Sequence, residues 1–296
     1  MTTTMPAPAE AAPAVEPMAR SSRSWLRRLG PLGIACAVIL GIAVVLAIIG
    51  PYLPGLDPES TDLPNAWVGP FQLPGSPLGF DAQGRDLLSR LIFGARTAIV
   101  GPLIVLIIAM SLGVTIGMIA AWRRGWLDSF LNFGLDILFG FPGILLAIVA
   151  AAVFGGGLWA AAIALSVAYL PFIARVVRNA AAKEGAMEYV AALRVQGVSA
   201  WRISVRHILP NISPIIVAQG TILFGYALVD LVAISFLGLG VQPPAADWGV
   251  MVNENLIGVL QGYPLPALAA GLVIVTVVVA VNVLGERLLD ISEGRR

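Results

Sequence analysis

Long apolar runs without a charge dominate the chain, and short charged or Pro- and Gly-rich stretches separate them. A bilayer core about 30 Å thick needs an apolar helix of about 20 residues to cross it. The run from 137 to 174 is too long for one crossing, but Gly155-Gly156-Gly157 divides it, and such a cluster favours a turn. We therefore expect six spans, at residues 29–52, 97–121, 130–154, 158–177, 213–236 and 265–285.

Composition supports this interpretation. Hydrophobic residues make up 58% of the chain, charged residues 12%, and the mean hydropathy is +0.89. Soluble domains carry about 25% charged residues, so the sequence predicts an all-α integral membrane protein. The lone Cys36 cannot support a disulfide framework.

Charge distribution predicts the topology. Residues 1–28 form a basic arm that we expect to be disordered, residues 29–96 the first span with an external segment, and residues 97–290 a five-helix core. With both termini in the cytoplasm, three basic residues lie outside (Arg85, Arg90 and Arg96) and the rest of the 18 lie inside. This bias follows the positive-inside rule and favours an even number of spans.

The end of the external segment has helical periodicity. Leu87, Leu88, Leu91 and Ile92 share one face, with polar side chains opposite. We expect a short amphipathic helix lying in the membrane interface, with Arg85, Ser89 and Arg90 in water.

The longest charged segment, residues 175–211, lies between the fourth and fifth spans. Six of its residues are basic, and only Glu184 and Glu188 are acidic. We expect these two carboxylates to share a helix face. Gly197 is suited to end that helix, Ser199 to cap a second one, and Leu209-Pro210 to interrupt the pattern. The pattern predicts a helical hairpin in water, which either docks a partner or serves only as a basic inside loop.

The hairpin contains the runs Glu188-Tyr189-Val190-Ala191-Ala192-Leu193 and His207-Ile208-Leu209-Pro210-Asn211, with Gly197 between them. In these residues it resembles the "EAA" loop of ABC importer permeases. In that family the loop sits in a cleft of the ATPase subunit. The motif's glutamate position holds Ala191 here, so its salt bridge does not carry over. By this resemblance, the coupling residues are Glu184, Glu188, Tyr189, Ala191, Ala192, Arg194, Gly197, Trp201, Arg202, Leu209 and Pro210.

Three further stretches are similar to the same family, the first to its dipeptide, oligopeptide and nickel branch and the last to its dipeptide and oligopeptide branch. They are Gly84-Arg85-Asp86; Asp136-Ile137-Leu138 with Phe141-Pro142-Gly143; and residues 235–244 followed by Trp248-Gly249. The resemblance implies a type I ABC importer permease in the bacterial inner membrane. It also implies a second homologous permease, two ATPase subunits that bind ATP and Mg, and an extracytoplasmic substrate-binding protein, with no nucleic acid.

The residues do not predict an enzyme. With one histidine, one cysteine and no clustered acids, the sequence lacks the parts of a metal site or a nucleophilic triad. Lys183, the only lysine, is not in a phosphate-binding loop, so ATP hydrolysis would belong to another subunit and no cofactor is expected in this chain.

Two acidic residues within or beside spans are candidates for a pathway or for helix packing. Asp136 is expected near the inner boundary, and Asp230 deeper, facing the bundle or a subunit interface. Pro142 is expected to kink the third span. The rival interpretation, a stand-alone secondary transporter or channel, would favour more intramembrane charges or internal repeats. A membrane scaffold without transport also remains open.

Overall fold

The computed structural model describes residues 25–122 and 125–292. The predicted disordered arm lies almost entirely outside the described residues. Within them, regular structure is helical apart from one isolated bridge between Phe80 and Asp86. The helices are α1 (Trp25–Ile49), α2 (Leu87–Trp122), α3 (Trp126–Phe139), α4 (Gly143–Phe154), α5 (Leu158–Glu184), α6 (Glu188–Val195), α7 (Ala200–Ile203), α8 (Leu209–Phe236), α9 (Trp248–Glu254), α10 (Leu256–Leu260) and α11 (Leu265–Ser292).

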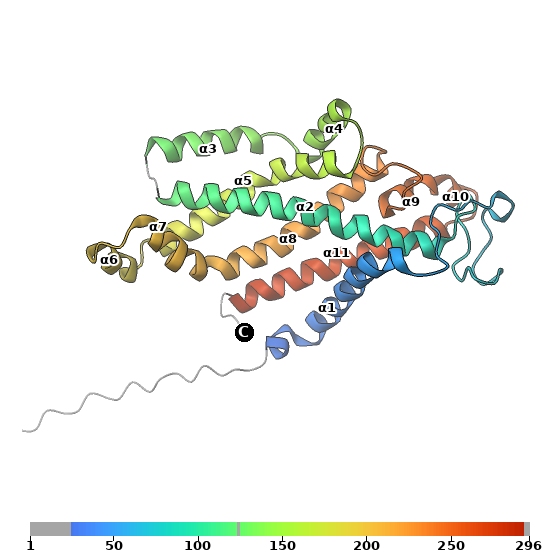
Figure 1. Cartoon of the computed structure of the whole chain (residues 1–296), viewed down its shortest axis with the longest axis horizontal. Coiled ribbons are helices and arrows are strands. Elements are labelled where there is room, and N and C mark those ends of the chain that lie inside the picture. Colours follow the sequence, from blue (N-terminus) through green and yellow to red (C-terminus); the bar gives the residue numbers. More distant parts are fainter. Residues whose placement is uncertain (1–24, 123–124, 293–296) are drawn as a thin grey trace, which may run out of the picture.

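Five helices are long and apolar enough to cross a membrane, and a bent pair, α3 with α4, makes a sixth candidate. Five of the predicted spans therefore correspond to α1, α2, α5, α8 and α11. Figure 1 shows the long helices side by side, with α6 and α7 at one end of the bundle and α9 and α10 at the other. The six-span fold is confirmed, and its elements differ from the prediction in three places.

The third span is broken rather than kinked. α3 ends at Phe139, α4 begins at Gly143, and their axes differ by 78°. Pro142 is the N-cap of α4 with an extended backbone (φ −58°, ψ 131°). A proline offers no N–H to the carbonyl four residues earlier and its ring crowds that carbonyl, which favours a break at this position. α3 is held to α5 by two ion pairs, Arg178 with Asp128 and Arg175 with Asp136.

The predicted interfacial helix is wrong. Residues 87–96 are the first turns of the 36-residue α2, and Arg85, Ser89 and Arg90 are buried instead of facing water. Arg90 is 0% exposed; its guanidinium lies 3.1 Å from the Glu254 carboxylate and 3.5 Å from that of Asp81. Burial became possible because α9 and the segment before α2 supply these acids, and a charge can be buried when it is paired.

The third difference concerns Pro210, which does not interrupt the helical pattern. α7, a π-helical turn over Ser204–Ile208 and α8 form one rod from Ala200 to Phe236. In the π turn, Leu209 donates its N–H to the Ser204 carbonyl, five residues back. Pro210 then falls in the first turn of α8, where its missing N–H costs little.

Close packing of α2 on α5 holds the bundle core. Gly113 and Gly117 lie on α2 where the backbone of α5 approaches; a Cβ on Gly117 would lie 2.6 Å from the Ala174 carbonyl oxygen. Small residues four apart let two membrane helices approach closely. The hairpin thus extends from a tightly packed helix.

Candidate functional site

The turn between α6 and α7 is fixed by Gly197. Its φ of +76° lies in the left-handed region that favours glycine. Gly197 N–H donates to the Arg194 carbonyl at 3.0 Å, and Val198 N–H donates to the Leu193 carbonyl at 3.1 Å. These two bonds define a Schellman motif, in which the side chains of Leu193 and Val198 also pack into one hydrophobic cluster. Gly197 therefore ends the first helix, as the sequence predicts.

The hairpin is anchored to the bundle by apolar side chains. Val190 of α6 and Ile203 of α7 are both 0% exposed, and Ile208 of the π turn is 1% exposed. They belong to one buried cluster with Ile173 and Val177 of α5. Removing a side chain of this size from water stabilises the folded state by about 1.5–3 kcal/mol. The cluster ties α6 and α7 to α5 and α8 as one body.

A polar contact fastens the start of α6. Tyr189 Oη donates to Glu184 Oε1 at 2.8 Å, and Asn211 Nδ2 donates to the same oxygen at 2.9 Å. Burial and the bond to Glu184 raise the pKa of Tyr189, so the phenol stays protonated and keeps donating.

Glu184 ends α5 and Glu188 begins α6. The expectation that they share one helix face is therefore wrong, because the turn at Gly185 separates them.

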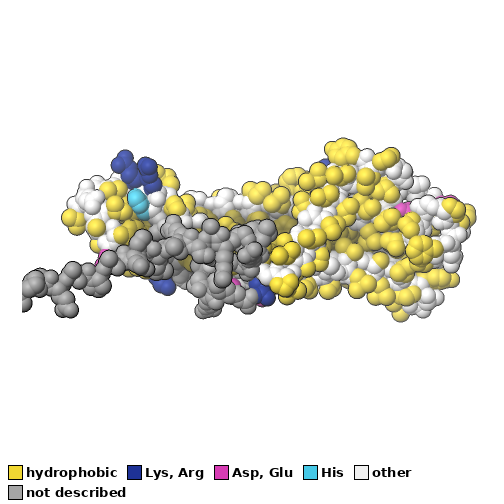
Figure 2. Space-filling model, turned by 90° about the horizontal axis from the view of Figure 1, so that it is seen from below, with side chains coloured by type: hydrophobic (Ala, Val, Ile, Leu, Met, Phe, Trp, Pro, Cys, Tyr) yellow, Lys and Arg dark blue, Asp and Glu magenta, His cyan; other side chains and the backbone are white. Residues whose placement is uncertain are grey.

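The outer surface of the hairpin combines apolar and basic side chains. Val195 is 89% exposed and Trp201 is 76% exposed, and Ala191, Ala192 and Arg202 are also exposed. Figure 2 shows Lys and Arg side chains beside the single histidine at this end of the molecule. An exposed tryptophan among basic residues is typical of a surface that a protein partner covers.

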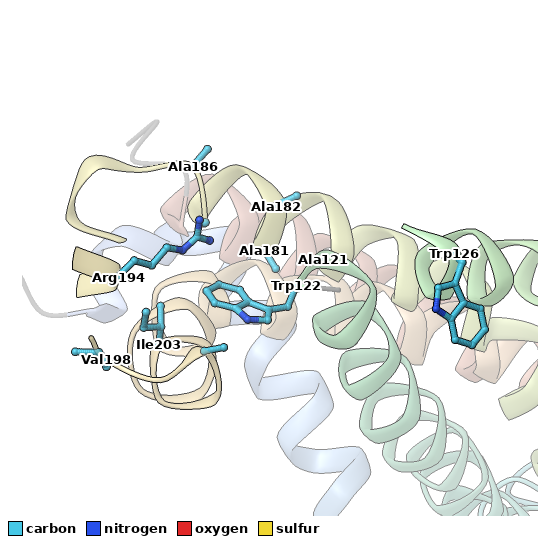
Figure 3. A pocket seen from close by; sticks show the side chains of 11 residues that line it. Ala121, Trp122, Trp126, Ala181, Ala182, Ala186, Arg194, Val198 and Ile203 are labelled. Carbon is cyan, nitrogen blue, oxygen red and sulfur yellow. The ribbon is translucent and has the colours of Figure 1, made fainter. Parts of the chain in front are cut away.

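A cavity of ≈ 810 Å³ opens behind the hairpin (Figure 3). The Arg194 guanidinium lies over the Trp122 ring, 4.8 Å from its centroid, on one side. Trp126 of α3 lies on the other side, and small residues of α5, among them Ala181 and Ala182, line the space between. Arg194 therefore contacts the bundle through Trp122. The position of the motif glutamate holds Ala191, and both Ala191 and Ala192 are exposed, so α6 presents methyl groups there instead of a carboxylate.

The remaining predicted residues lie farther along the bundle. The Asp136 side chain is 64% exposed and pairs with Arg175, whose guanidinium also lies 4.5 Å from the centroid of Phe139. Asp230 accepts a hydrogen bond from Tyr169 Oη at 2.7 Å. A cavity of ≈ 260 Å³ beside the α3–α4 break is lined by Asp230 and by Gly143, which follows Pro142. The structure thus brings Asp230 and the break together, apart from the hairpin.

Sequence reasoning missed the charge network at the end opposite the hairpin. Arg85 lies 2.8 Å from Asp81 and 2.6 Å from Glu254, and Arg90 pairs with the same acids. Next to it, Asp247 caps α9 by accepting the amides of Gly249 and Val250, and burial raises its pKa. A signal was present in Asp247-Trp248-Gly249, since an aspartate before an apolar turn is a helix-start pattern. Glu254 offered no such local signal, because it lies 169 residues from Arg85.

Comparison with known proteins places the chain in a family. The profile described as "Binding-protein-dependent transport system inner membrane component" matches residues 113–296, more than half of the chain. The chain belongs to this family. It is a membrane-spanning permease component, and the predicted location in the bacterial inner membrane is confirmed.

Curated relatives of this permease match over most of their length. The glutathione transport system permease protein GsiD of Pectobacterium atrosepticum is 33% identical over 268 residues, 90% of this chain and 88% of the relative. The dipeptide transport system permease protein DppC of Alkalihalophilus pseudofirmus is 33% identical, covering 88% and 84%. A putative peptide transport system permease protein of Brucella suis is 37% identical, covering 87% and 86%. The expected branch of the ABC importer permeases is thereby confirmed.

The solved structures support the fold of the permease. An inward-facing MetNI methionine ABC transporter contains a chain with a TM-score of 0.58 and 20% identity. The match covers 70% of this permease and 97% of that chain. The two share the type I ABC importer permease fold, and together with the relatives this favours an importer subunit over a stand-alone transporter.

Proposed function

We propose that this permease is the moving membrane subunit of an ATP-driven importer of di- or oligopeptides, and that the α6–α7 hairpin receives the motion of an ATPase subunit. The observation that carries the proposal is the hairpin itself, whose outer face is apolar and basic while its inner face is locked to α5 and α8. Relatives named as dipeptide and peptide permeases support the cargo class.

The hairpin is suited to this task because it is stiff. A force on Trp201 reaches α8 through α7 and the π turn, without an intervening loop, and a force on Val195 of α6 reaches α7 across the turn at Gly197. The same force reaches α5 through the cluster around Val190 and through the contact of Tyr189 with Glu184. Packed elements transmit displacement because interiors are dense and hardly compressible. Tilting of α5 and α8 would then alternate access across the membrane.

The proposal assigns sides to the bundle. The hairpin end faces the cytoplasm and two ATPase subunits, which hold ATP and Mg. The end with α9, α10 and the segment before α2 faces outward, where a substrate-binding protein delivers cargo. A second, homologous permease covers the α3–α4 side, which exposes large apolar residues such as Phe133 and Val153. The permease itself then needs no cofactor.

Co-purification in mild detergent tests the docking role. Trp201→Glu places a charge on the exposed apolar patch, and we expect it to reduce the recovery of ATPase subunits at least fivefold. Phe71→Glu is the matched control, since Phe71 is 83% exposed and lies in the segment before α2. Equal recovery with Trp201→Glu and wild type would contradict docking at the hairpin. Transport by the purified chain alone in liposomes would instead support the stand-alone rival.

A further inference from the structure

The cavity beside the α3–α4 break combines one carboxylate with aromatic rings. It has a volume of ≈ 260 Å³. Its lining comes from three parts of the chain, the break, α5 and α8: Phe139, Phe141, Gly143, Ala168, Tyr169, Phe172, Tyr226 and Asp230. Asp230 is its one charged side chain, and aromatic side chains make up most of the rest.

Asp230 lies in α8, a helix that is long and apolar enough to cross a membrane. It precedes the end of α8 by six residues, or roughly 9 Å at the rise of an α-helix. Among the described residues, Tyr169 Oη donates to its Oδ2 at 2.7 Å. An ionised carboxylate can accept about four hydrogen bonds, so one phenol leaves acceptor capacity unused. A carboxylate at this depth is costly and favours a functional role.

The break supplies an independent observation. Gly140, Phe141 and Pro142 leave the helical path at the same cavity, and the Phe141 side chain is 55% exposed. Irregular backbone at membrane depth is tolerated only where protein buries it or where it lines an aqueous cavity. Broken helices in transporters line substrate sites for this reason. Tyr226 of α8 also lines the cavity and is 52% exposed, so its side chain can be reached from outside.

Among the described residues, no basic side chain pairs with Asp230, because the arginines of α5 are paired with other acids. Arg175 pairs with Asp136, and Arg178 binds Asp128 through two bonds of 2.8 Å and 2.6 Å. Both basic groups of the α3–α5 contact are thus neutralised by acids of α3. The cavity therefore carries the negative charge of Asp230, and a cation that lies over one of the aromatic rings of the lining gains further attraction.

We propose that Asp230, Tyr169 and the surrounding rings form a transit site for a protonated amino group, such as the free amino terminus of a short peptide. This site rests on the proposed function, because cargo reaches it only if the permease forms the pathway. The carboxylate accepts the ammonium N–H groups, Tyr169 holds the carboxylate in place, and the rings of Phe141 and Tyr226 flank the charge.

Charge-selective labelling tests the site on the whole complex in membrane vesicles. Tyr226→Cys is introduced in a Cys36→Ala chain, and its modification rates by a cationic aminoethyl and an anionic sulfonatoethyl methanethiosulfonate are compared. We expect Asp230→Asn to lower the cation-to-anion rate ratio at least tenfold, which corresponds to about 1.4 kcal/mol of attraction. Asp230→Glu should retain the preference. Alanyl-alanine should slow the cationic reagent, whereas N-acetyl-alanyl-alanine should not.

Controls separate this inference from the proposed function. The Cys36→Ala chain without Tyr226→Cys measures labelling of other subunits, and Tyr169→Phe, which keeps the charge, should retain a cation preference. An unchanged rate ratio in Asp230→Asn, or equal protection by both peptides, would overturn the transit site. Recovery of ATPase subunits is measured on the same samples. If ATPase subunits do not co-purify with the wild-type chain, the proposed function is overturned even when the cation preference persists.

Discussion

Gly197 offers the sharpest test of the hairpin, because its turn depends on backbone conformation alone. Its φ is +76°, and a Cβ added there would meet no atom within 4 Å. Substitution therefore introduces no clash, only the cost of holding an L-residue in the left-handed region, roughly 1–2 kcal/mol. Asparagine tolerates this region best among non-glycine residues, and a β-branched side chain tolerates it worst.

The expected result is a graded loss of coupling in the order Asn, Ala, Val. A penalty of about 1–2 kcal/mol multiplies the population of competing turn conformations roughly 5- to 30-fold. Because Trp201 follows the turn by four residues, its direction relative to α6 changes in those conformations. Binding-protein-stimulated ATP hydrolysis by the reconstituted complex measures coupling, and a binding assay measures the affinity of the ATPase subunits.

Gly41 provides the matched control. It lies in α1, and a Cβ there would also meet nothing within 4 Å, but its φ is not positive. Gly41→Ala should leave coupling at the wild-type level. If Gly197→Val also couples like wild type, or if Gly197→Asn is more damaging than Gly197→Val, the turn does not position the docking surface.

Two further predictions concern stability and coupling. Glu254→Leu removes one acid from Arg85 and Arg90, and breaking a buried pair in this way costs roughly 3–5 kcal/mol of stability. The expected result is a lower unfolding temperature in detergent. Asp136→Asn is the control: it breaks an exposed pair and should change stability by less than about 1 kcal/mol. Tyr189→Phe loses a hydrogen bond to a carboxylate and should weaken ATPase coupling, with a stability cost of roughly 1.5–3 kcal/mol at most. Wild-type coupling in Tyr189→Phe would show that the apolar cluster alone holds α6.

Much of the fold follows from local sequence. Uncharged runs of bilayer length predict the spans, and the glycine at position 197 predicts the end of α6, because a run length and a left-handed turn are both properties of neighbouring residues. Arg90 could not be placed in this way. An arginine on one face of a helix predicts that the face is solvated unless acidic partners are known, and its partner Glu254 lies 164 residues away. Likewise, Tyr169 and Asp230 are 61 residues apart, so no pattern within one span could pair them.

The continuous rod from Ala200 to Phe236 makes the permease a lever. Its two prolines, Pro210 and Pro214, both fall in the first turns of α8, so the helix beyond Pro214 contains no proline that would kink it. Asp230 lies 30 residues from Ala200, roughly 45 Å at the rise of an α-helix. A tilt of the whole rod by roughly 10° about its hairpin end would carry Asp230 several ångströms sideways. A small stroke at the ATPase would thus be magnified where the cavity meets its partner.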